Sequence, residues 1–328
     1  MKTSTIAVLG AGSWGTAVAI HMASVGHRVM LWAHNPQHVS DMQQNQCNQR
    51  YLPNIPFPAT LKPIASLDEC IKQSDHIIIA VPSHAFASLL SQITQKPHDL
   101  SWLTKGVDPV THELLSEIVS KKWGDSLPFA VISGPSFARE VALKLPTAIV
   151  IAGKNTNYLK AMRSILHKDN MRVYLSHDYI GVQLCGAVKN VLAIACGISD
   201  GLKYGANAKA ALITRGLAEM SRLGERLGAQ SNTFMGLAGV GDLVLTCTDD
   251  QSRNRRFGLL LGQGISLLEA EKQIGQVVEG KYNAAQVCAL ALKFGVDMPI
   301  CSEVNALLLG EVSAKEAVNH LMERPPRD

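Results

Sequence analysis

Residues 5–23 read TIAVLGAGSWGTAVAIHMA, in which a β-rich run, a glycine-rich turn and a helical pattern follow one another. In this order the turn is the dinucleotide-binding fingerprint. Gly10 allows the tight turn, Gly12 leaves room for a diphosphate against the backbone, and Gly15 lets the helix lie close to the strand. A glycine turn alone can be structural, but here a second strand pattern follows as well. The stretch therefore predicts dinucleotide binding at a helix N-terminus.

The predicted second strand, residues 28–33, is followed by His34 and Asn35. The acidic residue that usually accepts the ribose hydroxyl groups of NAD is missing there. A 2′-phosphate would meet no repulsion, and His34 could contact it, although a solvent-facing loop histidine is a comparable alternative. The sequence therefore permits NADPH or NADH as the cofactor.

β-rich runs alternate with helical patterns through about residue 176, as in a parallel sheet with crossover helices. Residues 77–81 and 148–151 are apolar throughout, which is typical of strands covered on both faces. Residues 51–58 contain three prolines and are predicted to form a surface loop. The predicted strands are residues 5–9, 28–33, 76–81, 100–104, 129–132, 147–151 and 171–175.

Helical patterns dominate after residue 177, separated by glycines and by caps such as Ser313 with Glu316. A chain of 328 residues also exceeds the roughly 250–300 residues at which single cores stop growing. We therefore predict an α/β protein with two domains. Residues 1–180 form a Rossmann-type doubly wound sheet that binds the dinucleotide, and residues 181–328 form an all-α domain that binds the substrate.

The composition excludes several other classes of protein. Hydrophobic residues make up 47% and charged residues 18%, as in folded globular proteins. The net charge of +4, without a run of Lys and Arg, does not indicate a nucleic-acid partner. The seven scattered cysteines include no Cys-x-x-Cys pair, so we expect reduced thiols and a cytoplasmic location. The most apolar later stretch, around residues 191–198, is far below the roughly 20 residues of a membrane span and has Lys189 beside it, so no membrane insertion is expected.

Two lysines are candidates for chemistry. Lys105 follows a predicted strand, and ligands of doubly wound folds lie beyond the carboxyl ends of strands; a solvated loop lysine is the alternative. Lys189 lies in an otherwise apolar helical pattern, and lysine is rarely buried without a partner. It could snorkel to solvent. A desolvated lysine shifted toward neutrality could instead exchange a proton with an alkoxide, as carbonyl reduction requires.

Residues 251–256, QSRNRR, combine three arginines with hydroxyl and amide donors, which suits an anion site. A helix start decorated with charge is the alternative. The spacing alone does not decide between the two.

Five motifs in order extend this picture: GAGSWGTA at 10–17, TKG at 104–106, GPSFA at 134–138, VKN at 188–190, and DL at 242–243 followed by SRN at 252–254. With them the chain resembles bacterial NAD(P)-dependent glycerol-3-phosphate dehydrogenase from about residue 5 to 310. The resemblance implies reversible hydride transfer that reduces dihydroxyacetone phosphate to sn-glycerol 3-phosphate for phospholipid synthesis. No metal is needed, because cationic side chains can stabilise the alkoxide. A homodimer is expected only as the commonest oligomer.

The resemblance also implies roles for individual residues. Lys189 would be the general acid in reduction and the base in the reverse reaction, and Lys105 would polarise and position the substrate. Asp242 would orient Lys189, with Thr246 one helical turn later on the same face. The implied substrate-binding residues are Lys105, Gly134, Ser136, Lys189, Asp242, Ser252, Arg253 and Asn254. The implied cofactor-binding residues are Gly10, Gly12, Ser13, Trp14, Gly15, His34, Lys105, Ala138, Arg253, Val277 and Glu279.

Two other functions fit the same architecture. Hydroxyacid and hydroxyacyl-CoA dehydrogenases also join a Rossmann domain to a helical domain, but they act on carboxylates or thioesters. A nucleotide-sensing protein without turnover is the second alternative. The presence of Lys189 and Asp242 argues against it.

Overall fold

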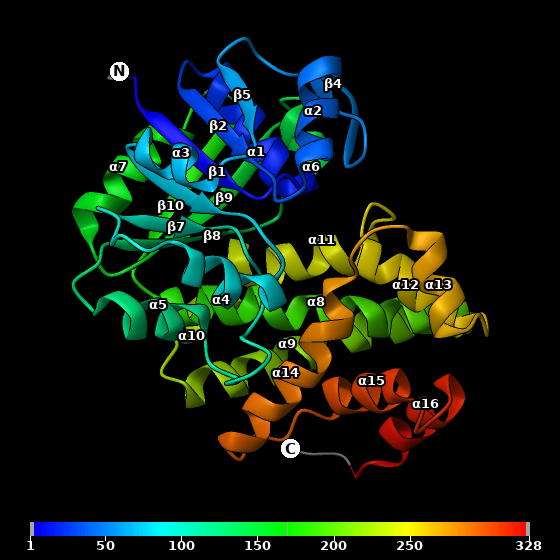
Figure 1. Ribbon diagram of the computed structural model, residues 1–328. Helices are drawn as coiled ribbons and strands as arrows, with labels where there is room; N and C mark the ends of the chain where they lie inside the picture. Colours follow the sequence, from blue (N-terminus) through cyan, green and yellow to red (C-terminus); the bar gives the residue numbers. More distant parts are fainter. Residues whose placement is uncertain (1–2, 169, 326–328) are drawn as a thin grey trace. The chain divides into compact units, whose positions relative to one another are not determined.

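The structure is a computed structural model that describes residues 3–168 and 170–325 (Figure 1). The chain divides into two compact units. The first comprises Met1–Thr104 and Ser116–Tyr179, and the second comprises Lys105–Leu115 and Ile180–Asp328. Residues 105–115 therefore pack with the second unit, although the sequence places them between two elements of the first.

The first unit contains an eight-stranded sheet with the order β10-β9-β8-β7-β6-β1-β2-β5. All neighbouring strands are parallel except β8 and β9. This mostly parallel sheet confirms the predicted Rossmann-type class. The strands are β1 (Thr5–Leu9), β2 (Arg28–Trp32), β5 (Leu61–Ile64), β6 (His76–Ile79), β7 (Leu100–Trp102), β8 (Phe129–Ser133), β9 (Thr147–Ala152) and β10 (Met171–Ser176).

Three features of the sheet differ from the prediction. The pairing of β9 with β8 is antiparallel, unlike the parallel pairing that the alternation of strands and helices predicts. The connection between these strands holds only the five-residue helix α6 (Ala138–Ala142), which is too short to return along a strand. The prediction of a loop at residues 51–58 is wrong, because β4 (Leu52–Pro56) pairs with β3 (Cys47–Asn48) in a separate two-stranded ribbon. Prolines are tolerated there because both strands are edges. Strand β5, LKPI, was not predicted.

Helices cover both faces of the sheet. Ser101 of β7 hydrogen-bonds Tyr158 on one face (2.7 Å), while its neighbour Trp102 packs against Phe86 on the other. Successive side chains of a strand point to opposite faces, so β7 is buried on both sides. The helices of this unit are α1 (Ser13–Ser24), α2 (Pro36–Asn45), α3 (Leu67–Lys72), α4 (Ser83–Gln92), α5 (Leu115–Trp123), α6 and α7 (Thr156–Leu166).

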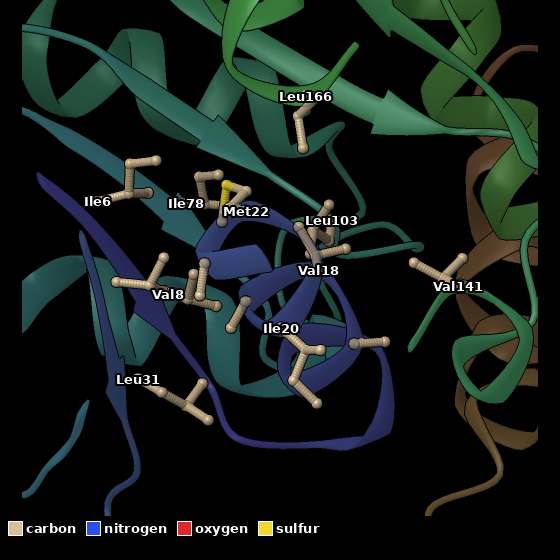
Figure 2. Packing of buried hydrophobic residues seen from close by; sticks show 14 of the residues in the cluster. Ile6, Val8, Val18, Ile20, Met22, Leu31, Ile78, Leu103, Val141 and Leu166 are labelled. Atoms are coloured by element: carbon tan, nitrogen blue, oxygen red, sulfur yellow. The ribbon is translucent and has the colours of Figure 1, made fainter. Parts of the chain in front are cut away.

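The glycine turn between β1 and α1 depends on the absence of side chains. Gly10 has φ +130°, and a Cβ there would lie 2.6 Å from the carbonyl oxygen of Ala80. A Cβ at Gly15 would lie 2.1 Å from the oxygen of Gly10. Helix α1 can therefore sit directly on the sheet, where Val18 and Met22 lie beside Leu103 and Ile78 (Figure 2).

The second unit is helical, as predicted (Figure 1). It is built around α8 (Tyr179–Gly201), whose residues 181–199 are all buried. Within the described chain, α8 is the one helix long and apolar enough to cross a membrane, but 94% of its apolar window is buried, as in the core helix of a domain. The other helices are α9 (Gly205–Arg226), α10 (Ser231–Phe234), the π-helical turn η1 (Leu237–Gly241), α11 (Asp242–Thr248), α12 (Arg253–Gly262), α13 (Leu267–Ile274), α14 (Glu279–Lys293), α15 (Pro299–Leu309) and α16 (Ala314–Glu323).

Glycines bring α12 into backbone contact with α8. A Cβ at Gly258 of α12 would lie 2.1 Å from the oxygen of Ile194, and a Cβ at Gly197 of α8 would lie 2.0 Å from the oxygen of Arg255. Both distances are far below van der Waals contact. The close approach places the first turn of α12 beside the middle of α8, where Lys189 and Asn190 lie.

Candidate active site

Lys189 is buried in α8, with 6% of the residue exposed. Its Nζ donates hydrogen bonds to Oδ1 of Asp242 and to Oγ1 of Thr246, the latter at 3.0 Å. Asp242 and Thr246 stand one turn apart in α11. The Thr246 hydroxyl donates to the backbone oxygen of Asp242 (2.6 Å), which leaves its lone pairs to accept from Lys189. The buried ammonium therefore has two fixed acceptors.

A second lysine reaches the same carboxylate. Lys105 Nζ lies 2.8 Å from Oδ2 of Asp242, so each carboxylate oxygen faces one lysine. All of these residues belong to the second unit. We call Lys105, Lys189, Asp242 and Thr246 the lysine–aspartate cluster.

The cluster separates the two lysines in pKa. Burial lowers the pKa of Lys189 to about 7, and repulsion from Lys105 acts in the same direction, against the attraction of Asp242. Burial also opposes the charge of Lys105, but attraction to Asp242 outweighs it and raises the pKa of Lys105. The two lysines likewise outweigh burial at Asp242 and lower its pKa. Lys105 and Asp242 thus stay ionised at neutral pH, while Lys189 is poised to gain or lose a proton.

An amide network borders the cluster. Asn254 of α12 donates to Oδ1 of Asn190 (2.9 Å) and accepts from the backbone N–H of Gly280 (2.9 Å). Asn190 lies 3.5 Å from Glu279, whose pKa is raised by burial despite the nearby charge of Arg253. Asn254 therefore joins α8, α12 and the start of α14, so its side-chain amide is engaged within the protein. Sequence reasoning did not assign roles to Asn190 and Gly280, although Asn190 lies in the VKN motif.

The three arginines of residues 251–256 have different surroundings. Arg253 opens α12 and donates to the side chain of Gln276 (3.2 Å). Arg255 pairs with Asp200 (2.6 Å) and with Asp250, so it is held within the protein. Arg256 is exposed. Ser252 caps the helix by accepting from the N–H of Arg255 (3.2 Å). The charges thus lie at a helix start, with Arg253 at its first position, and an anion site at residues 251–256 stays a prediction.

The remaining predicted residues lie in the first unit or near α14. Open space lies over Gly12, since a Cβ there would meet no heavy atom within 4 Å. The N-cap residue of α1 is Gly12 itself, which has no side chain to cap the helix. This combination fits a dinucleotide diphosphate. Ser13 donates to the backbone oxygen of Tyr51 (2.8 Å).

Other predicted residues follow strand ends. His34 is exposed after β2. Gly134, with φ +130°, and Ser136, whose hydroxyl donates to the oxygen of Gly134 (2.9 Å), follow β8. Trp14 and Ala138 pack against the core of the first unit, and Val277 is exposed before α14. In the part of the chain that the structure describes, no group of three His, Cys, Asp or Glu could hold a metal ion.

Comparison with known proteins identifies the family. The model of the NAD-dependent glycerol-3-phosphate dehydrogenase N-terminus matches residues 5–159, and the model of its C-terminus matches residues 178–319. The chain belongs to the NAD-dependent glycerol-3-phosphate dehydrogenase family. This confirms the resemblance that the five sequence motifs indicated.

Relatives in the glycerol-3-phosphate dehydrogenase family match over the full length. A Legionella pneumophila protein named glycerol-3-phosphate dehydrogenase [NAD(P)+] is 66% identical over 328 residues, 100% of both chains. A Bartonella tribocorum protein of the same name is 52% identical over 332 residues, 100% of this chain and 99% of its own. The crystal structure of glycerol-3-phosphate dehydrogenase from Coxiella burnetii has a TM-score of 0.95 at 50% identity, covering 98% of this chain and 99% of that one. A structure of D-mandelate dehydrogenase, at 14% identity and a TM-score of 0.64, shares the fold alone.

Proposed function

We propose that this chain is an NAD(P)-dependent glycerol-3-phosphate dehydrogenase that reversibly reduces dihydroxyacetone phosphate to sn-glycerol 3-phosphate. The observation that carries the proposal is Lys189, a buried lysine with a pKa of about 7, held by Asp242 and Thr246. Family membership indicates the substrate class. The lysine–aspartate cluster supplies groups suited to the proton chemistry of ketone reduction.

Each member of the cluster has a distinct task in this proposal. Lys189, as an ammonium, donates a proton to the oxygen on C2 of the substrate, and as an amine it accepts that proton in the reverse reaction. Lys105 stays charged and stabilises negative charge on the same oxygen. Asp242 and Thr246 hold Lys189 in place. A bound nicotinamide would supply or accept the hydride. NADPH or NADH is the proposed cofactor, and the absence of an acid directly after β2 leaves the 2′-phosphate of NADPH unopposed.

The substrate phosphate is assigned to the start of α12. The Arg253 guanidinium and the first backbone N–H groups of the helix suit a phosphate dianion. We assign Ser252 and Asn254 to the same subsite, with Asn254 fixed by Asn190. Family resemblance adds Gly134 and Ser136 to the substrate residues. Besides the glycine turn, the resemblance assigns further residues to the cofactor: Ser13, Trp14, His34, Lys105, Ala138, Arg253, Val277 and Glu279.

The biological setting follows from the reaction. sn-Glycerol 3-phosphate is the backbone of phospholipids, so we place the enzyme in phospholipid synthesis in the cytoplasm. A homodimer is the proposed assembly, because twofold dimers are the commonest oligomers. The first unit is proposed as the dinucleotide-binding domain and the second as the substrate-binding domain.

The pH dependence of the two directions should be opposite. Oxidation of glycerol 3-phosphate needs neutral Lys189, so its kcat/KM should rise with pH through a midpoint of about 7. Reduction of dihydroxyacetone phosphate needs the ammonium and should decline above the same midpoint. Steady-state rates over the neutral range, with the cofactor saturating, test this. A midpoint near that of an ordinary lysine, about 10, would remove the proton-transfer role of Lys189.

The substitution Arg253→Ala should mainly weaken substrate binding. Losing a charge-assisted contact to phosphate is expected to raise KM for dihydroxyacetone phosphate roughly 10- to 100-fold, with a smaller effect on kcat. Because Arg253 is also assigned to the cofactor, the cofactor must be saturating, and slow turnover of unphosphorylated dihydroxyacetone should then be unchanged. Arg256→Ala, three residues later and exposed, is the matched control and should behave as wild type. Equal losses on both substrates would place Arg253 outside the phosphate subsite.

A substrate panel distinguishes the hydroxyacid alternative. Dihydroxyacetone phosphate should be turned over with NADPH or NADH, whereas 2-oxo acids and 3-oxoacyl thioesters should not. Turnover of an oxo acid in place of the phosphorylated triose would replace the proposed function with that of a hydroxyacid dehydrogenase.

A further inference from the structure

Lys105 reaches the active site on a segment that packs with the helical unit. This Lys105 segment, residues 105–115, lies between β7 and α5 in the sequence. Val107 and Leu114 pair in an antiparallel bridge, and both belong to the apolar core of the second unit. The Asp108 carboxylate accepts from the backbone N–H groups of Val110 (3.1 Å) and Thr111 (2.8 Å). The Lys105 segment is therefore anchored in the second unit.

Two buried side-chain amides of α14 hold the Lys105 segment. Asn283, with 0% exposure, places Nδ2 3.2 Å from the backbone oxygen of Ala187 and 3.5 Å from that of Lys105. One turn later, Gln286 accepts from the backbone N–H of Val107 (3.4 Å). A Cβ at Gly186 would lie 3.2 Å from Cγ of Lys105, so the lysine stem lies directly on α8. Lys105 is thus held at three points: Asn283 holds its backbone, α8 packs against its stem, and Asp242 pairs with its ammonium.

We propose that Asn283 is a positioning residue for the reaction, which holds the backbone of Lys105 beside α8 and thereby keeps the Lys105 ammonium on Asp242. The proposal rests on the proposed function, in which Lys105 and Asp242 belong to the substrate site. Asn283 suits the task because one side-chain NH₂ group carries two donors, one for each carbonyl oxygen. An alkyl side chain would leave both carbonyl groups without this donor.

Displacing Lys105 has a specific electrostatic consequence at Lys189. The charged groups around Lys189 are Lys105, Asp242 on α11 and Glu279 on α14. The free thiol of Cys247 also lies near, but a hydrogen bond with the Cys196 thiol and burial raise its pKa well above normal, so it is uncharged. Repulsion from Lys105 helps to lower the pKa of Lys189. If Lys105 withdraws, Asp242 pairs with Lys189 alone and the pKa of Lys189 rises. Loosening of the fold would also raise this pKa, because burial is the largest cause that lowers it, so the test needs a control variant that loosens α14 without releasing Lys105.

The substitution Asn283→Ala tests the proposal in the full-length enzyme. We expect kcat/KM for dihydroxyacetone phosphate to fall roughly 10- to 100-fold, because small displacements of a catalytic group are costly. The pH midpoint of glycerol 3-phosphate oxidation should move upward. Val287→Ala, which removes buried apolar atoms one turn later in α14, is the matched control and should keep the wild-type midpoint. Asn283→Ser, which keeps a donor, should lie between wild type and Asn283→Ala. An unchanged midpoint in Asn283→Ala would overturn the proposal.

A double-variant cycle tests whether Asn283 acts through Lys105. Adding Asn283→Ala to Lys105→Ala should cause no further loss of rate, and a full additional loss would overturn the proposal.

A readout without turnover separates this proposal from the proposed function. Acetic anhydride labelling with mass spectrometry should show greater reactivity of Lys105 in Asn283→Ala and Asn283→Ser than in wild type or Val287→Ala. Unchanged reactivity would contradict the positioning role. Wild-type protein that fails to turn over dihydroxyacetone phosphate would refute the proposed function, whatever the labelling shows.

Discussion

Replacing Lys189 by alanine is expected to remove most turnover while NADPH binding stays within about twofold of wild type. General acid–base groups contribute roughly 10²- to 10⁴-fold to rate, and Lys189 is the buried cluster member with a pKa near neutrality. The nucleotide should still bind, because the glycine turn lies in the first unit. Stopped-flow turnover with dihydroxyacetone phosphate and fluorescence titration with NADPH measure the two effects separately.

Two controls separate proton transfer from packing in this experiment. Lys189→Met fills most of the volume of the lysine stem and should be as inactive as Lys189→Ala. A small primary amine added to Lys189→Ala should restore part of the rate, because it can occupy the cavity and carry the proton. Turnover of either variant within tenfold of wild type would show that another group transfers the proton.

Asp242→Asn should cost both activity and stability. The substitution leaves two buried lysines without their shared anion, and breaking a buried ion pair in this way costs about 3–5 kcal/mol. Activity should fall by at least roughly 100-fold, because neither lysine keeps its orientation. Thermal unfolding, followed by circular dichroism, measures the stability loss.

The stability loss should also depend on pH. Without Asp242, burial and mutual repulsion depress the pKa of both lysines in the folded state, so the unfolded state binds more protons. The variant should therefore gain stability relative to wild type as pH rises from 6 to 9. Asp125→Asn is the control, because its ion pair with Lys154 spans 3.8 Å at the exposed surface and should contribute little. If the stability difference between Asp242→Asn and wild type does not change with pH, the two lysines are not the cause of the destabilisation.

Local patterns in the sequence predicted the elements on which the fold depends. The glycine turn at residues 10–15 and the apolar run at 77–81 predicted a doubly wound sheet, because tight turns and buried strands leave their marks within a few residues. Lys189 could be recognised as a candidate from an apolar helical pattern alone. Its partners Asp242 and Thr246 stand more than 50 residues away. Spacing could not join them, and only the family resemblance did.

Contacts over long distances in the sequence account for what was not predicted. The antiparallel β9 and the edge strands β4 and β5 depend on pairing partners, which compensate for prolines that local rules assign to loops. The packing of residues 105–115 with the helical unit depends on Asn283 and Gln286, more than 170 positions later. The pattern of residues 251–256 alone does not distinguish Arg255 from Arg253, whereas pairing with Asp200 does. These features are set by tertiary packing.

The most direct test of the account is to add dihydroxyacetone phosphate to the purified protein with NADPH, and in parallel with NADH, and to follow the nicotinamide absorbance. We predict rapid loss of absorbance with at least one nucleotide and formation of sn-glycerol 3-phosphate as the product. No loss with either nucleotide, from protein shown to bind NADPH, would contradict the assignment of the lysine–aspartate cluster to this reaction.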